Sequence, residues 1–233
     1  MLRAFLFDMD GVLYDSMPLH AEAWYHVMHD IYGFTCTREL FYREEGATGD
    51  QVITDMYLEQ RGRHLTPEEA AAIYREKGEA FKALGPARPM PGAAEVLRKV
   101  GENSLTRVLV TGSGQLSMLN RLSRDYPGCF DVSHIVSAMD TPIGHGKPHP
   151  DPYLMGLKKA GNLLPEEAIV VENAPLGVQA GKAAGIFTVG VNTGPLPKEC
   201  LSEAGADVVL NSMQELADSF DKILSLYLKR NTN

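Results

Sequence analysis

The sequence predicts an α/β fold in which a parallel sheet with covering helices is interrupted by an inserted all-helical domain. Beyond residue 92, short apolar runs alternate with helical stretches, a pattern typical of βαβ units with right-handed crossovers. Residues 17–85 instead show helical periodicity and no strand-like run. We therefore expect a core domain made of residues 1–15 and 90–233, and a helical cap domain made of residues 16–89.

The first expected element is a strand at residues 4–7, which read Ala-Phe-Leu-Phe. A run this short and this apolar is typical of a strand that is buried on both faces. The periodicity then becomes helical over residues 18–31, where apolar residues recur every four positions from Leu19 to Ile31. The insert therefore begins with a helix that presents one apolar face.

Two more helices are expected in the insert, at about residues 50–60 and 66–84. Thr66 is followed by Pro67 and Glu69. Threonine at the N-cap, proline at the first helical position and glutamate three residues after the cap form the pattern of a capping box. Prolines then crowd residues 86–91, which indicates the return of the chain to the core.

The core is expected to continue as alternating helices and strands. Helices are predicted at residues 93–100, 115–124, 151–160 and 212–229. A further helix is predicted between the strand at 168–172 and residue 184. Strands are predicted at residues 107–111, 134–137, 168–172, 187–191 and 207–210. Ser212 is the expected N-cap of the C-terminal helix.

Composition narrows the classes of partner. The chain has 233 residues, 44% of them hydrophobic, which is enough for a sizeable core, and its net charge of −8 argues against nucleic acid as a partner. No apolar run approaches the roughly 18 residues of a membrane helix, and there is no signal-type N-terminus. Three distant cysteines indicate no disulfide framework. A cytoplasmic monomer without a membrane partner is the expectation, although the sequence does not determine the oligomeric state.

Polar residues follow the predicted strands. Asp8 and Asp10 come directly after the first strand and precede Gly11. Ligands of open α/β sheets bind at the carboxyl ends of strands, and carboxylates are costly to bury without partners. The two acids therefore indicate a metal site or an acid/base pair. The alternative is that they only cap a turn.

Three further segments also lie at the ends of predicted strands. Thr111-Gly112-Ser113 follows a strand and could bind an anion through its backbone amides, or it is an ordinary turn. Lys147 lies in a loop rich in glycine and proline, where it could neutralise a phosphoryl group or be solvated. Glu172-Asn173 ends another buried strand, and an amide oxygen can bind Mg²⁺ with one negative charge fewer than a carboxylate.

These four segments, in this order, resemble the four motifs of the haloacid dehalogenase-like (HAD) phosphohydrolases and mutases. The resemblance covers essentially the whole chain and implies a Rossmann-like core with a helical cap inserted after the first motif. It is greatest for the branch that contains β-phosphoglucomutase. The combination of Glu45 with Glu172-Asn173 is similar to a HAD subgroup that hydrolyses inorganic pyrophosphate. Related enzymes often have a cis bond at the position of Lys147–Pro148.

The resemblance also implies roles for residues. Asp8 would attack phosphorus and form an aspartyl-phosphate, and Asp10, projecting from the strand on the same side, would act as general acid and base. The phosphoryl oxygens would be bound by Lys147, Thr111, Gly112 and Ser113. His20 on the first cap helix fits the branch, either at the substrate or packed beneath the lid.

Mg²⁺ is the cofactor that the resemblance implies. Its ligands would be the Asp8 carboxylate, the Asp10 backbone carbonyl and Asn173, while Glu172 would position a bound water. Glu45 could reach the metal and restore the carboxylate missing at position 173, or it is a solvated loop acid. A small phosphorylated substrate is expected.

Three functions remain open on the sequence. The leading one is a Mg²⁺-dependent phosphohydrolase, with pyrophosphate as the best single substrate. The alternative is a sugar-phosphate isomerase of the β-phosphoglucomutase type, which is weakened because Gly49 stands where an arginine would grip a second phosphate. The third is a phosphate-responsive binding protein that has lost turnover.

Overall fold

The computed structural model describes residues 1–112, 116–142 and 144–231 and contains a six-stranded sheet whose paired strands are all parallel. The strand order is β5-β4-β1-β6-β7-β8. The strands are β1 (Ala4–Phe7), β4 (Thr106–Val110), β5 (Ile135–Val136), β6 (Ala168–Glu172), β7 (Phe187–Val191) and β8 (Val208–Leu210). The expected α/β class is confirmed, and β1 lies between β4 and β6 at the centre of the sheet.

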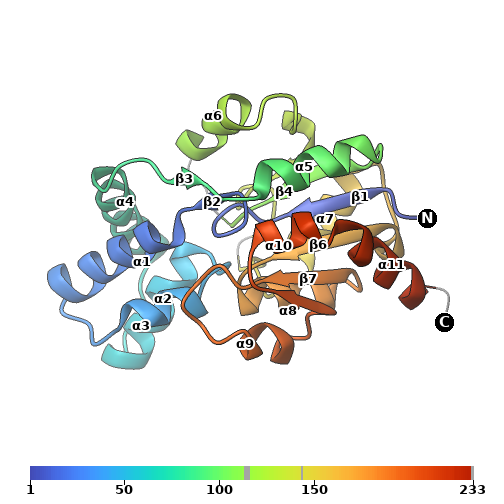
Figure 1. Ribbon diagram of the computed structural model, residues 1–233. Helices are drawn as coiled ribbons and strands as arrows, with labels where there is room; N and C mark the ends of the chain where they lie inside the picture. Colours follow the sequence, from blue (N-terminus) through green and yellow to red (C-terminus); the bar gives the residue numbers. More distant parts are fainter. Residues whose placement is uncertain (113–115, 143, 232–233) are drawn as a thin grey trace.

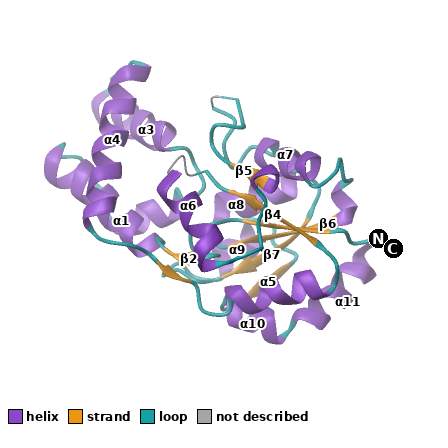
Figure 2. Cartoon of the chain, turned by 90° about the horizontal axis from the view of Figure 1, so that it is seen from above, coloured by secondary structure: helices purple, strands orange, loops and turns teal. Residues whose placement is uncertain are grey.

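Helices cover both faces of the sheet (Figure 2). On one side lie α5 (Ala93–Glu102), α10 (Met213–Asp218) and α11 (Phe220–Asn231), and on the other lie α7 (Asp151–Lys159) and α8 (Pro175–Ala183). Strand β1 contributes to both layers, because Phe5 and Phe7 pack toward the first set and Leu6 toward the second. The strand has no exposed residue, as its uniformly apolar sequence predicts.

The inserted segment is helical, as expected, and has its own core. It contains α1 (Met17–Tyr25), α2 (Arg38–Arg43), α3 (Gly49–Arg61) and α4 (Pro67–Ala83). These helices lie together, away from both chain termini (Figure 1). The capping box at α4 is confirmed, because Glu69 N donates to Thr66 Oγ1 at 3.3 Å and Thr66 N to Glu69 Oε2 at 2.9 Å. A buried cluster that includes Trp24, Phe41, Ile53 and Ile73 holds the four helices together.

The two connections between core and insert pair with each other. The short strands β2 (Tyr14–Asp15) and β3 (Arg88–Pro89) form an antiparallel ribbon, which the sequence did not predict as strands. We propose that this ribbon marks the passage between the two domains, with the division after residue 15 and before residue 90. No helix in the described part of the chain is both long enough and apolar enough to cross a membrane.

Several local expectations were wrong. The helix expected at 18–31 changes into a π-helix, η1 (His26–Ile31), and Ile31 is 54% exposed rather than on the apolar face. Helices α2 and α9 (Glu199–Glu203) were not predicted. Each is short and has a single buried residue, Phe41 in α2 and Leu201 in α9, so neither shows an apolar periodicity. The C-terminal helix begins after Ser212, as expected, but it is interrupted at Ser219. The remaining core helix, α6 (Leu116–Asp125), lies where expected.

Candidate active site

The ends of three neighbouring strands and two loops meet at one edge of the sheet. Asp8 follows β1, Thr111 follows β4, and Glu172 is the last residue of β6. Because these strands are adjacent and parallel, their carboxyl ends lie side by side. Lys147 comes from the loop that precedes α7, and Glu45 comes from the loop after α2 in the cap. All five residues are buried.

Lys147 links three of the strand ends. Its Nζ donates to Glu172 Oε1 at 2.5 Å, to the Val110 carbonyl at 3.2 Å and to Asp8 Oδ1. Burial alone would lower the pKa of Lys147, but the carboxylates of Asp8 and Glu172 outweigh it and hold the pKa above its ordinary value. The lysine is therefore charged and buried, not solvated. The bond from Lys147 to Pro148 is cis, as the resemblance implies.

Glu172 is held by protein donors at both carboxylate oxygens. Tyr153 OH donates to Oε1 at 2.7 Å, while Asn173 N and Ala174 N donate to Oε2 at 3.0 and 3.4 Å. Tyr153 was not singled out in the sequence, because a tyrosine on an amphipathic helix is usually a core residue. In this arrangement Glu172 orients Lys147 toward Asp8.

Contrary to expectation, Asp10 does not project from the strand on the same side as Asp8, because β1 ends at Phe7. The chain turns at Gly11, which has φ +76°, and Gly11 N donates to the Tyr14 carbonyl at 2.7 Å. The turn still brings Asp10 into the same pocket as Asp8. Ser16 Oγ donates to Asp10 Oδ1 at 2.5 Å, and His20 Nε2 lies 3.2 Å from the same oxygen. Burial alone would raise the pKa of Asp10, but His20 and Ser16 hold it below its ordinary value.

His20 connects Asp10 to the cap lysine Lys77. His20 Nδ1 lies 2.5 Å from Lys77 Nζ, and the imidazole ring stacks on Phe81 with a centroid separation of 4.1 Å. The ring therefore packs within the cap, as one of the two expectations has it, and contacts Asp10, while its position at the substrate stays a prediction. Burial, followed by the charge of Lys77, lowers the pKa of His20, and burial lowers the pKa of Lys77 to about 7.

Replacement of Lys77 should change how stability depends on pH. A folded-state pKa of about 7 against an ordinary 10.5 means that the unfolded chain binds more protons between these pH values. The free energy of unfolding should therefore rise with pH across that window, and this contribution is lost as the pH falls through about 7. Urea unfolding at pH 7 and near pH 10 should show a smaller rise in Lys77→Met than in the wild type. Equal slopes would contradict the pKa assigned to Lys77, and the exposed Lys82→Met is the control.

Glu45 closes the pocket from the cap side. Asn173 Nδ2 donates to Glu45 Oε1 at 2.8 Å, so a residue of the cap is hydrogen-bonded to a residue of the core. Burial, followed by repulsion from Asp8, raises the pKa of Glu45 well above its ordinary value. Gly46 and Gly112 allow the two loops to approach, because a Cβ on Gly112 would lie 3.1 Å from the Gly46 carbonyl oxygen. Glu45 is therefore not a solvated loop acid, and the cap is closed.

The residues of this pocket fit a hard divalent cation. The Oδ1 atom of Asn173 is buried and has no hydrogen-bond partner among the described residues. Burial raises the pKa of Asp8 to about 8, Lys147 lowers it, and Glu172 and Asp10 raise it further, so a cation bound beside Asp8 would favour its ionised form. Carboxylate and amide oxygens are the donors that Mg²⁺ prefers. An unpartnered amide oxygen close to several carboxylates is a donor set that suits Mg²⁺.

The space enclosed between cap and core is small. The pocket has a volume of about 70 Å³. A cavity needs about 10–15 Å³ of such volume to hold one water, so the pocket has room for several waters while the cap is closed. The predicted residues that line it are Asp8, Asp10, His20, Glu45 and Gly112. Thr111 is buried directly before Gly112, and Ser113 lies outside the described residues.

Comparison with known proteins identifies the class. The family model for haloacid dehalogenase-like hydrolases matches residues 2–185. The chain therefore belongs to the haloacid dehalogenase-like hydrolases. It is a phosphatase of this family, in the branch that contains β-phosphoglucomutase.

Individual relatives agree with this assignment over nearly their whole length. The phosphorylated carbohydrates phosphatase of Thermotoga maritima is 31% identical, covering 96% of this chain and 100% of its own. Hexitol phosphatase A of Escherichia coli is 32% identical, covering 92% of this chain and 93% of its own. A solved structure of a candidate β-phosphoglucomutase from Bacteroides vulgatus is 48% identical, with a TM-score of 0.91, and covers 97% of this chain and 90% of its own.

Proposed function

We propose that this chain is a Mg²⁺-dependent phosphohydrolase that works through an aspartyl-phosphate on Asp8. The observation that carries the proposal is that Asp8 and Asp10 line one pocket between cap and core, while Lys147 contacts Asp8 from behind the lining. Asp8 Oδ1 contacts the charged Lys147, and the pocket in front of it also exposes Asp10. Attack by Asp8 replaces one difficult displacement by two easier ones.

Asp10 is the group that we propose for proton transfer. In the first half-reaction it would protonate the leaving group, and in the second it would take a proton from the attacking water. Ser16 and His20 hold one of its oxygens, so the carboxylate is oriented before substrate arrives. Lys147 would stabilise the charge on the phosphoryl oxygens, together with backbone amides near Gly112.

Mg²⁺ would be held by Asp8, the Asp10 carbonyl, Asn173 and Glu45, and when bound it would supply positive charge to the phosphoryl oxygens. Glu172 was expected to position a water at the metal. Its hydrogen bonds to Lys147, Tyr153 and two amides support a role in orienting the lysine. We therefore assign Glu172 to the support of Lys147, beside the metal and not on it.

Inorganic pyrophosphate is the substrate that we propose. Glu45 lines the pocket and is hydrogen-bonded to Asn173 in the core, and the pocket, of about 70 Å³, is small for a sugar phosphate. Among the described residues that line the pocket, Lys77 is the lysine that comes from the cap. Its Nζ contacts His20 and so is not directed at a second phosphate. The carboxylate of Glu45 would therefore repel a second phosphate that carries no metal ion. A diphosphate in complex with Mg²⁺ would instead bind through the ion that Glu45 helps to hold.

The isomerase alternative is less well supported by the geometry. A Cβ on Gly49 would lie 2.2 Å from the ring of Tyr74, so an arginine does not fit at this position without displacing the tyrosine. Arg43 is exposed and pairs with Glu39, and Lys82 is exposed and pairs with Glu79. Neither basic residue reaches the pocket in the closed arrangement.

A sugar phosphate is the second candidate substrate. The relatives from Thermotoga maritima and Escherichia coli are named for phosphorylated carbohydrates and for hexitol phosphates. Such a substrate would have to enter with the cap opened about the β2–β3 ribbon, since the closed pocket does not hold a sugar.

A panel of substrates with Mg²⁺ separates these functions. We expect hydrolysis of pyrophosphate to exceed that of hexose and hexitol phosphates in kcat/KM. In Glu45→Gln this activity should fall by about tenfold or more, and the Mg²⁺ concentration for half-maximal rate should rise, because one oxygen ligand loses its charge. Glu44→Gln, a change in the neighbouring residue of the same pocket, is the matched control and should keep its rate within about threefold.

Other outcomes contradict the proposal in distinguishable ways. Faster hydrolysis of a sugar phosphate would replace the substrate but keep the mechanism. Isomerisation of β-glucose 1-phosphate without release of phosphate would favour the mutase. Binding of phosphate without turnover of any compound would favour the phosphate-responsive binding protein.

A further inference from the structure

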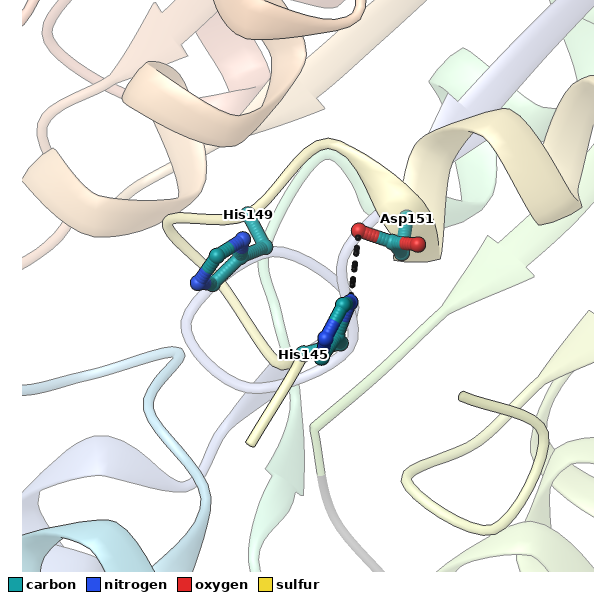
Figure 3. Close-up of side chains that lie close together, drawn as sticks. All are labelled: His145, His149 and Asp151. Atoms are coloured by element: carbon teal, nitrogen blue, oxygen red, sulfur yellow. Dashed lines mark ion pairs between the residues drawn. The ribbon is translucent and has the colours of Figure 1, made fainter. Parts of the chain in front are cut away.

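The loop that carries Lys147 also presents three potential metal ligands on its outer side. His145, His149 and Asp151 lie together there, with their ligand atoms all within 4.8 Å of one another (Figure 3). His145 Nδ1 is 3.3 Å from Asp151 Oδ2. The two imidazole rings lie nearly parallel, with centroids 5.0 Å apart. In the described residues this is the place where three such groups converge.

The local backbone explains the convergence. His149 N donates to the Gly146 carbonyl at 2.9 Å, so the chain reverses around Lys147. The lysine side chain is buried in the active site, while both histidines are exposed on the opposite side of the loop. Asp151 is the first residue of α7, which holds its backbone in place. The rigid helix start and the tight turn thus bring residues two positions before and after Lys147 to one spot.

We propose that His145, His149 and Asp151 form a binding site for a divalent transition ion of the Zn²⁺ type, separate from the Mg²⁺ site. Imidazole nitrogen suits Zn²⁺, Ni²⁺ and Cu²⁺, whereas Mg²⁺ prefers oxygen donors. Zinc ligands at about 2.0–2.1 Å in a tetrahedron are roughly 3.3 Å apart, which is the distance between His145 Nδ1 and Asp151 Oδ2. Rotation of the exposed His149 ring completes the triad, and a fourth position remains open.

The surroundings favour a cation at this site. His149 also lines a groove of about 270 Å³ between cap and core, and the cap side of that groove carries Glu44 and Asp55. Lys147 also lines the groove, but it is paired with Asp8 and Glu172, and the chain as a whole has a charge of −8. Both histidines are exposed, so a metal ion and one exchangeable ligand can reach them from solvent.

Calorimetric titration of the full chain with Zn²⁺, in the presence of saturating Mg²⁺, tests the proposal. We expect about one equivalent of Zn²⁺ to bind, and His145→Ala or His149→Ala to weaken this binding by about tenfold or more, since each removes one of three ligands. His26→Ala is the matched control. His26 is exposed and pairs with Asp30 in the cap, 3.1 Å away, as His145 pairs with Asp151.

The variants themselves should fold, because both histidines are exposed, and Mg²⁺-dependent turnover without Zn²⁺ should be unchanged in each. Co²⁺ used in place of Zn²⁺ should give the visible absorption of a four-coordinate ion in the wild type and not in the double variant His145→Ala/His149→Ala. Equal Zn²⁺ affinity in the wild type and the double variant would overturn the proposal. So would loss of the site in His26→Ala, or displacement of Zn²⁺ by Mg²⁺.

Discussion

Asp8→Asn should abolish turnover, with a loss of about 10⁴-fold or more in kcat. An amide of the same shape keeps the contact with Lys147 but cannot attack phosphorus as a carboxylate does. Asp8 is 5% exposed and contacts Lys147, so the substituted side chain is held in the same place. The measurement is steady-state release of phosphate from pyrophosphate at saturating Mg²⁺.

Asp15→Asn is the control for this variant. Asp15 is an exposed carboxylate of β2, close in sequence and outside the pocket. It should retain its rate within about threefold. Asp8→Asn also alters a proposed Mg²⁺ ligand, so its rate is compared over a range of Mg²⁺ concentrations. Release of phosphate by Asp8→Asn at a wild-type rate would rule out Asp8 as the nucleophile.

Lys147→Met should have the second largest effect, because it removes the only cation that contacts both Asp8 and Glu172 among the described residues. Breaking a buried ion pair at one partner costs about 3–5 kcal/mol, so the free energy of unfolding at pH 7 should fall by about this amount. The matched control is Lys159→Met, where a more exposed lysine pairs with Asp140 at 2.6 Å. The free energy of unfolding of Lys159→Met should be lower than that of the wild type by about 1 kcal/mol or less.

The pH dependence of Lys147→Met provides an independent check. Without the lysine, the pKa of Asp8, which is about 8 in the wild type, should rise further, so the folded variant keeps a proton above pH 8 that the folded wild type releases. The lost stability should then be largest near pH 10 and be partly recovered as the pH is lowered to about 8. Urea unfolding of wild type and variant at both pH values measures this difference. A deficit that is independent of pH would show that lost packing, and not uncompensated charge, destabilises the variant.

Much of the core could be predicted because it follows from local patterns. Strand β6 (Ala168–Glu172) and strand β7 (Phe187–Val191) lie where their apolar runs predicted them. The capping box at Thr66 specifies the start of α4 within the sequence itself. Asp8 and Asn173 could be expected to meet because residues that follow adjacent parallel strands share one edge of the sheet, whereas Lys147, in the longer loop before α7, was expected there from the family resemblance.

The remaining features depend on contacts between distant segments. Tyr153 and Glu172 are 19 residues apart in the sequence, and His20 and Lys77 are 57 apart. No local sequence pattern therefore predicts either contact. The bond between Glu45 and Asn173 spans 128 positions and exists only because the cap is closed. The cluster of His145, His149 and Asp151 could not be predicted either. Only the three residue types are visible in the sequence, and the turn at Gly146 is what brings the side chains together.

Trapping the phosphorylated enzyme tests the central claim most directly. Asp10→Asn should slow hydrolysis of the intermediate by about 10²–10⁴-fold, while pyrophosphate can still transfer a phosphoryl group, because phosphate needs little help to leave. Acid quench of this variant after mixing with pyrophosphate and Mg²⁺, followed by peptide mass mapping, should find one phosphoryl group on Asp8. Absence of any adduct in a variant that still releases phosphate, or an adduct on another residue, would contradict the account.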